Sequence, residues 1–198
     1  MKRVLLTLVV VAFALTASAA EFPVDKGSML VGGSLYFMNQ GGDLYKVGDE
    51  AQTTIGIMPE FGYFVAPSIM VGATIDWTNW SQGDFKESQM AFGPMVGYFF
   101  NMDPERTEIK GALYPYIKGF MMIGTYKYED GTNPDEKANL MAFGGKGGIN
   151  YMLTESVALD FGIMFSSDSY KMKEPVEADE ATTGTTIQVG VGISAFVF

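Results

Sequence analysis

The stretch Val157-Ala158-Leu159-Asp160-Phe161-Gly162-Ile163-Met164-Phe165-Ser166 alternates strictly between two kinds of side chain. Its odd positions are all large and apolar, whereas its even positions are small, polar or methionine. Because successive side chains of a β-strand point to opposite faces, this alternation predicts a strand with one apolar face and one small or polar face. Ten residues is also about the length of a strand that crosses a bilayer at a tilt.

The same alternation recurs along the chain and predicts eight strands. They lie at about residues 28–38, 53–64, 69–80, 88–100, 112–126, 139–152, 157–167 and 184–198. The connections at 39–52, 81–87, 127–138 and 168–183 are polar and mostly long, those at 65–68 and 153–156 are tight, and 101–111 is a longer polar turn. Alternating long and short connections are typical of an antiparallel up-and-down β-barrel with its long loops at one rim.

The first twenty residues have the layout of a secretory signal peptide. Two cations, Lys2 and Arg3, precede an apolar run over residues 4–15, and small residues follow at 17–20. The run is too short to span a bilayer as a helix, which needs about 20 residues. We therefore expect a signal peptide over residues 1–20, cleaved after Ala19 or Ala20, and one domain over residues 21–198.

The composition excludes several classes of function. The 198 residues include no cysteine and no histidine, and the formal net charge is −10. Without these residue types there is no disulfide framework, no Cys-ligated zinc, no thiol nucleophile and no Ser-His-Asp triad. A strongly acidic chain is a poor partner for nucleic acid, whose phosphates need clustered lysine and arginine. We expect no enzyme activity, no cofactor and no metal site.

The small and polar face of the strands decides between a soluble and a membrane barrel. A soluble barrel turns its apolar face inward, whereas a membrane barrel turns it toward lipid. Here the other face is rich in glycine, which makes a poor solvent-facing surface, and the apolar face carries almost no charge. Aromatic residues near the strand ends match the girdles found at membrane interfaces: Tyr63, Trp77, Tyr98 and Tyr151. The pattern favours a transmembrane barrel over a secreted soluble one that binds ligands.

The chain combines a signal peptide and eight alternating strands with three local features: Gly-Tyr-Phe turns at 62–64 and 97–99, the segment 148–162 (GINYMLTESVALDFG) and a terminal Phe198. In this combination it resembles the OmpA/OmpX-type outer-membrane β-barrel family. The resemblance covers residues 21–198 and implies an eight-stranded barrel in the cell outer membrane, next to lipopolysaccharide. It matches the barrel alone, without a C-terminal peptidoglycan-binding domain. Membership of such a family implies location and fold and leaves activity open.

The last strand carries a second part of this resemblance. Phe198 with Phe196 two residues earlier resembles the C-terminal signal by which the barrel assembly machinery recognises outer-membrane proteins. These two residues have the opposite parity to the apolar residues of the same strand, Ile187, Val189, Val191 and Ile193. A bulge near Ser194-Ala195 would bring the two sets onto one face.

The few charges on the strands are the first candidate functional residues. All five lie on the small and polar face and are expected inside the barrel: Glu60, Asp76, Lys118, Lys146 and Asp160. A buried charge needs a partner or water, so these residues predict a salt-bridge network that plugs the lumen. Two sharper alternatives are a gate that opens a small pore and a catalytic acid/base pair such as Glu60 and Asp76.

The connections form the second candidate. The four long ones carry fourteen acids against six lysines. The acids are Asp43, Asp49, Glu50, Asp84, Glu87, Glu129, Asp130, Asp135, Glu136, Asp168, Glu174, Glu177, Asp179 and Glu180. The lysines are Lys46, Lys86, Lys127, Lys137, Lys171 and Lys173. They are either simply solvated, or a surface for adhesion, or a contact with lipopolysaccharide bridged by divalent cations. The leading hypothesis is a non-enzymatic outer-membrane barrel that supports envelope integrity or surface contact, and its alternative is a narrow channel or carrier for small solutes.

Overall fold

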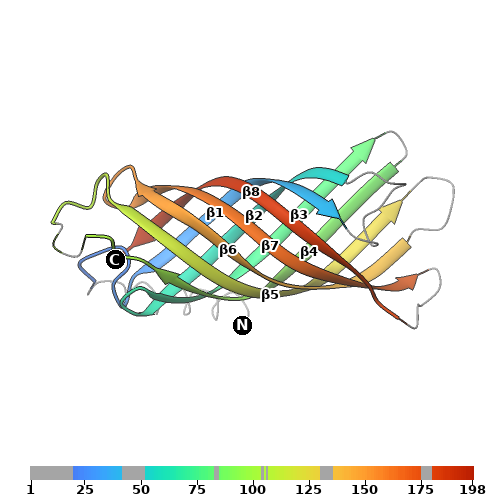
Figure 1. Cartoon of the computed structure of the whole chain (residues 1–198), viewed down its shortest axis with the longest axis horizontal. Helices are drawn as coiled ribbons and strands as arrows, with labels where there is room; N and C mark the ends of the chain where they lie inside the picture. Colours follow the sequence, from blue (N-terminus) through green and yellow to red (C-terminus); the bar gives the residue numbers. More distant parts are fainter. Residues whose placement is uncertain are drawn as a thin grey trace, which may run out of the picture.

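The computed structural model describes residues 20–41, 52–82, 85–103, 105, 107–129, 136–174 and 180–198. Eight antiparallel strands form a closed barrel in sequence order, with β1 paired to β8 (Figure 1). The strands are β1 (Met29–Gly41), β2 (Gln52–Ala66), β3 (Ile69–Gln82), β4 (Phe85–Phe99), β5 (Leu113–Glu129), β6 (Glu136–Met152), β7 (Val157–Glu174) and β8 (Thr182–Val197). The predicted eight-stranded up-and-down barrel is confirmed.

The two ends of the barrel differ. At the turn rim, the connections are 67–68, 100–112 and 153–156, and the chain also ends there (Figure 1). At the loop rim, the strands end at residues 41, 52, 82, 85, 129, 136, 174 and 182. Two of the three turn-rim connections are short, as the periplasmic turns of membrane barrels are, although the one at 100–112 is long; we assign the turn rim to the periplasm.

The strands reach further toward the loop rim than the sequence pattern predicts. Strand β7 extends to Glu174, whereas the alternation predicted an end at residue 167. Placing Asp168 in a loop is therefore wrong: it lies on β7 and is buried. Polar residues on both faces weaken the alternation there, although the strand itself continues.

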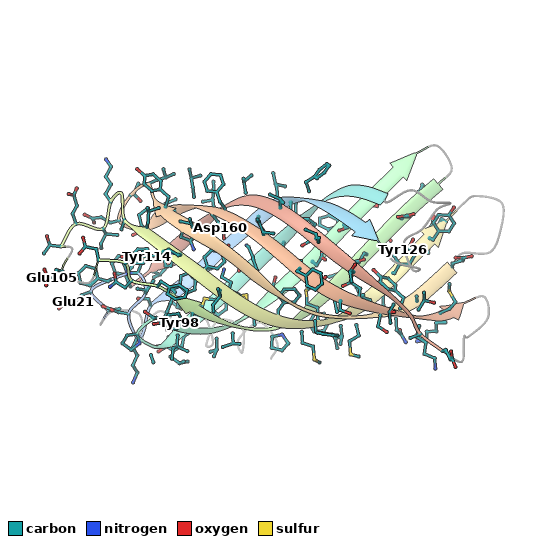
Figure 2. All side chains as sticks on the ribbon, in the orientation of Figure 1. Glu21, Tyr98, Glu105, Tyr114, Tyr126 and Asp160 are labelled. Atoms are coloured by element: carbon teal, nitrogen blue, oxygen red, sulfur yellow. The ribbon has the colours of Figure 1, made fainter. Side chains whose placement is uncertain are left out.

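The outer face of the barrel carries an apolar band; Figure 2 draws the side chains as sticks on the ribbon. Large apolar side chains on every strand point outward, from Ile57 at 37% exposed to Phe143 at 61%. A monomeric soluble protein rarely exposes so large an apolar surface. Tyr98 and Tyr151 point outward beside the turn rim, as expected of an interfacial girdle, whereas Trp77 points outward from further along β3. Within the described residues, no helix is long and apolar enough to cross a lipid bilayer.

The turn rim is closed by the segment that precedes β1. Pro23 and Val24 are buried against the lumen, and Val24 belongs to the same apolar cluster as Phe64. The backbone fixes this segment to the barrel, because Ser68 N donates to Val24 O at 2.8 Å and Gly27 N donates to Phe64 O at 2.9 Å. The residues that follow the predicted cleavage site therefore form a cap over the periplasmic end.

Strand β8 does not contain the bulge that the sequence pattern suggested. Both ladders of β8 keep an unbroken register through Ser194 and Ala195, so the bulge is absent there. Phe196 points into the barrel and is 2% exposed, whereas Val197 points outward. The inward ring of Phe196 lies 6.5 Å from that of Phe64, between ring centroids, and so the last strand ends as part of the core at the turn rim.

Candidate functional site: the charged lumen

The structure places all five candidate charges inside the barrel. Glu60, Asp76, Lys118, Lys146 and Asp160 are each between 2% and 6% exposed. They come from β2, β3, β5, β6 and β7 in that order, so the barrel wall gathers them from far apart in the sequence. Figure 2 labels Asp160, which lies nearer the turn rim than Tyr126, a residue at the loop rim.

Four of the five form one ionic network. Lys118 Nζ lies 2.7 Å from Glu60 Oε2, and Lys146 Nζ lies 3.1 Å from Glu60 Oε1. Lys146 Nζ also lies 3.3 Å from Asp160 Oδ2. The network holds two cations and two anions, so its formal charge is balanced. We call these four residues the lumen network.

The network spans the barrel from wall to wall. Glu60 lies on β2 and Lys146 on β6, which are four strands apart in the eight-stranded ring. Lys118 and Lys146 are direct cross-strand partners on β5 and β6, a placement that is unfavourable for two like charges. Because Glu60 accepts a hydrogen bond from both lysines, its carboxylate compensates this repulsion and connects opposite walls of the barrel.

Tyr116 completes the network, and two glycines make room for it. Its hydroxyl donates to Asp160 Oδ1 at 2.7 Å, and its ring centroid lies 4.3 Å from Lys118 Nζ. A Cβ added at Gly148 would lie 2.5 Å from the Tyr116 hydroxyl oxygen, and one at Gly162 would lie 2.7 Å from it. Both distances are shorter than a van der Waals contact, so glycine is needed at both positions for the phenol to reach Asp160.

Asp76 does not join the lumen network, contrary to the expected meeting of all five charges. It accepts hydrogen bonds from the Tyr36 hydroxyl and from Gln89 Nε2, the latter at 3.2 Å. Gln89 in turn accepts a hydrogen bond from the Tyr170 hydroxyl. Asp76 is thus held by neutral donors rather than by a lysine.

Asp168 is a second carboxylate of this kind. The hydroxyls of Ser166 and Thr186 both donate to it, the first at 2.9 Å. A sequence signal for Asp168 was present, because the inward even positions of β7 continue through Ser166 and Asp168 to Tyr170. Tyr36 and Tyr116 gave no such signal, since a tyrosine on a small and polar face is compatible with many roles.

A void of about 10 Å³ lies beside Tyr36, Lys146 and Gln188. That volume is about the minimum that a single water molecule needs. Nearer the turn rim the interior is filled by Phe64, Phe99 and Phe196, which are all buried. Among the described residues, no group of three or more Asp, Glu, His or Cys could hold a metal ion.

The residues assigned to the long connections divide into three groups. The strands themselves carry Lys86, Glu87, Lys127, Glu129, Glu136, Lys137, Asp168, Lys171, Lys173 and Glu174. Glu180 lies just before β8 and is exposed. The others lie outside the described residues: Asp43, Lys46, Asp49, Glu50, Asp84, Asp130, Asp135, Glu177 and Asp179. The loop rim is therefore mixed in charge where it is described, rather than uniformly acidic.

Comparison with known proteins agrees with this architecture. The chain is similar to Neisserial surface protein A, with a TM-score of 0.63 and 12% identity, covering 87% of this chain and 100% of the other. It is also similar to the outer membrane protein OprG of Pseudomonas aeruginosa, with a TM-score of 0.52 and 13% identity, covering 88% of this chain and 98% of the other. These likenesses concern the fold. No protein with a curated function matches the chain.

A family model gives the assignment. Residues 5–194 match the model of the outer membrane protein beta-barrel domain, which is nearly the whole chain. The outward apolar band and the inward charges both agree with that location. The chain belongs to the family of outer membrane proteins with a β-barrel domain and resides in the outer membrane.

Proposed function

We propose that this protein is a closed, non-enzymatic barrel that supports the outer membrane or its contacts with the surroundings, and that it does not conduct solutes. The observation that carries the proposal is the bridge from Glu60 to Lys118 and Lys146 across the lumen. A solute that passed through would have to separate these charges inside a low-dielectric interior, where an unpaired charge costs several kcal/mol.

Two further features support a closed lumen. The cap formed by Pro23 and Val24 covers the periplasmic end, and the void beside Lys146 is large enough for only about one water molecule. An eight-stranded barrel is in general just wide enough for side chains to fill it. The absence of histidine and cysteine from the sequence supports a non-enzymatic role, because the common nucleophile and base pairs need them.

A bilayer experiment tests closure. The purified barrel, inserted into a planar bilayer at physiological salt, is expected to give no stepwise current. Glu60→Gln and Lys118→Ala remove opposite ends of one ion pair, so each serves as a probe of the lumen. Steps in the wild type that change in either variant would contradict the closed barrel and support the alternative, a narrow channel.

The narrow channel is the second candidate because the lumen is polar at its centre. Tyr36, Lys146 and Gln188 surround the small void, and rearrangement of Lys146 would enlarge it. Under this alternative the lumen network acts as a gate. Conductance of the wild type is therefore the measurement that separates the two functions.

A complementation experiment separates support of the membrane from surface contact. A strain that lacks the protein is compared with strains that express the full chain or a chain lacking residues 175–179, which lie between β7 and β8 in the sequence. Sensitivity to detergent reports envelope integrity, and attachment to a test surface reports contact. Rescue of both by the shortened chain favours a role of the barrel itself, whereas selective loss of attachment assigns contact to the loop rim.

A further inference from the structure

Two buried polar side chains near the turn rim have no hydrogen-bond partner among the described residues. Asn150 on β6 is 0% exposed, and both the oxygen and the nitrogen of its amide are unpaired. Ser194 on β8 is also 0% exposed, and its hydroxyl is unpaired. Other buried polar side chains of the lumen do have partners, for example Ser166 and Thr186, which both donate to Asp168. Because unpaired buried polar groups are costly and rare, Asn150 and Ser194 indicate a ligand.

The register of three adjacent strands brings Asn150 and Ser194 to the two sides of Asp160. Asn150 is directly opposite Asp160 in the β6–β7 ladder, and Asp160 is opposite Gly192 in the β7–β8 ladder. Ser194 follows two positions after Gly192 and therefore points to the same face of β8. Since neighbouring strands lie about 4.8 Å apart, β6 and β8 are about 10 Å apart along the wall. Inward side chains of a narrow barrel converge, so the remaining gap has the size of a small ligand.

The residues around this gap are small. A Cβ added at Gly32 on β1 would lie 2.8 Å from Ser194 Oγ, which is shorter than a van der Waals contact, so glycine at position 32 leaves the hydroxyl its place. Ala158, directly opposite Ser194 on β7, and Gly192 contribute at most a methyl group to the lumen. The side chains between β6 and β8 therefore leave room beside the carboxylate of Asp160.

The chemistry of these side chains selects a neutral ligand that both donates and accepts hydrogen bonds. Asp160 Oδ2 already lies 3.3 Å from Lys146 Nζ, and the formal charge of the lumen network is balanced, so a metal cation would add an uncompensated charge beside a lysine. A metal cation would also leave the NH₂ group of Asn150 without an acceptor. Water accepts from that group and donates to oxygen atoms, and a buried water needs only two to four polar partners.

We propose that Asn150, Asp160 and Ser194 bind ordered internal water that joins the lumen network to β8. One molecule accepts from the Asn150 amide nitrogen and donates to the Asp160 carboxylate. Another donates to the Asn150 amide oxygen and accepts from the Ser194 hydroxyl. The ion pairs alone join β2, β5, β6 and β7, whereas the water adds β8, the strand that closes the barrel against β1. This site goes beyond the proposed closed-barrel function and does not depend on it.

Water-directed NMR of the folded, ¹⁵N-labelled barrel in detergent micelles tests the proposal. The NH₂ group of Asn150 is expected to show a rotating-frame Overhauser cross-peak with the water resonance, whose sign separates a bound water from proton exchange. Ser194→Ala removes only a hydroxyl and is expected to lose most of that cross-peak. The matched control is Ser28→Ala, because Ser28 is equally buried but its hydroxyl donates to Phe22 O at 2.8 Å. Absence of the cross-peak from the wild type, or equal loss in both serine variants, would overturn the proposal.

Unfolding equilibria in urea give a second measurement of the same link. Asn150→Leu and Ser194→Ala change groups that share no direct hydrogen bond, so without water their effects on the unfolding constant would multiply. With shared water, the double variant is expected to raise that constant about tenfold less than the product of the single variants. Asn150→Leu combined with Ser28→Ala is expected to give the simple product. A simple product for Asn150 and Ser194 would refute the link, whereas a conducting wild type would contradict only the closed barrel.

Discussion

Lys118 and Lys146 face each other directly across the β5–β6 ladder, and both donate to the same carboxylate, that of Glu60. Two ammonium groups side by side in a water-poor interior repel strongly. The structure contains the pair because one acid on the opposite wall serves both. The repulsion between the lysines thus makes Glu60 the residue on which the lumen network depends.

Neutralising Glu60 is expected to destabilise the barrel by about 3–5 kcal/mol, the usual cost of leaving a buried charge without its partner. Urea unfolding of Glu60→Gln in detergent micelles, followed by tryptophan fluorescence and heat-modifiable mobility, measures the change. The control is Glu155→Gln in the exposed β6–β7 turn. Adding Lys118→Met to Glu60→Gln is expected to recover part of the loss, since it removes one uncompensated cation. Equal stability of Glu60→Gln and the control would refute the role given to Glu60.

Removing the hydroxyl of Tyr116 is expected to cost about 1.5–3 kcal/mol, the range for a hydrogen bond to a charged group. Tyr116→Phe keeps the ring beside Lys118 and loses only the bond to Asp160. Tyr151→Phe is the matched control, because that tyrosine points outward. The unfolding midpoints of the two variants in urea give the comparison, and a larger effect at Tyr151 would show that the lumen bond contributes nothing.

The two C-terminal phenylalanines are expected to behave differently. Phe196→Ala leaves a cavity in the core at the turn rim and should cost about 3–5 kcal/mol when the purified chain is refolded without any assembly factor. Phe198→Ala should cost less, because Phe198 is only partly buried. If both form an assembly signal, Phe198→Ala will lower the amount of protein in the outer membrane while leaving its refolded stability close to the wild type. Equal membrane amounts would remove Phe198 from that signal.

The cap over the turn rim is expected to contribute to stability. Val24→Ala removes two buried carbons, which corresponds to about 1.5 kcal/mol at roughly 0.8 kcal/mol for each buried methylene. Val31→Ala, on the outer face of β1, leaves no cavity and is the control. Denaturant midpoints measured for chains that begin at residue 21 make the comparison. An effect no greater than that of Val31→Ala would mean that the segment rests on the rim without stabilising it.

The cost in folding free energy of a charge on the outer face is expected to depend on how deep in the membrane the residue lies. Phe143→Arg puts a cation in the middle of the apolar band and should cost about 2–4 kcal/mol in a lipid bilayer. Asn139→Arg lies four residues nearer the loop rim on the same strand and should cost about 0–1 kcal/mol. Folding equilibria in vesicles measure both. Similar costs at the two positions would place the bilayer boundary elsewhere on the barrel.

The fold could be predicted from sequence because one physical signal, the alternation of two faces, repeats on every strand. The inward position of Lys118 and Lys146 followed from the same parity. Which charges meet could not be predicted, because partners across the lumen depend on register and tilt. Asp76 therefore lies with Tyr36 and Gln89 rather than with the lysines it was expected to join. The burial of Val24 was also missed, since an isolated valine before a strand has no periodicity.

The pairing of β1 with β8 joins opposite ends of the chain, with Met29 beside Val197. A chain made from its N-terminus forward completes β1 long before its partner exists. Until then β1 presents an unpaired edge, which is open to pairing with another copy and so to aggregation. Pairing β1 with β8 also closes a loop that contains all the other strands, and contacts between residues so far apart in the sequence form slowly. Until β8 has been made and has paired with β1, the newly made chain must therefore be kept apart from other copies.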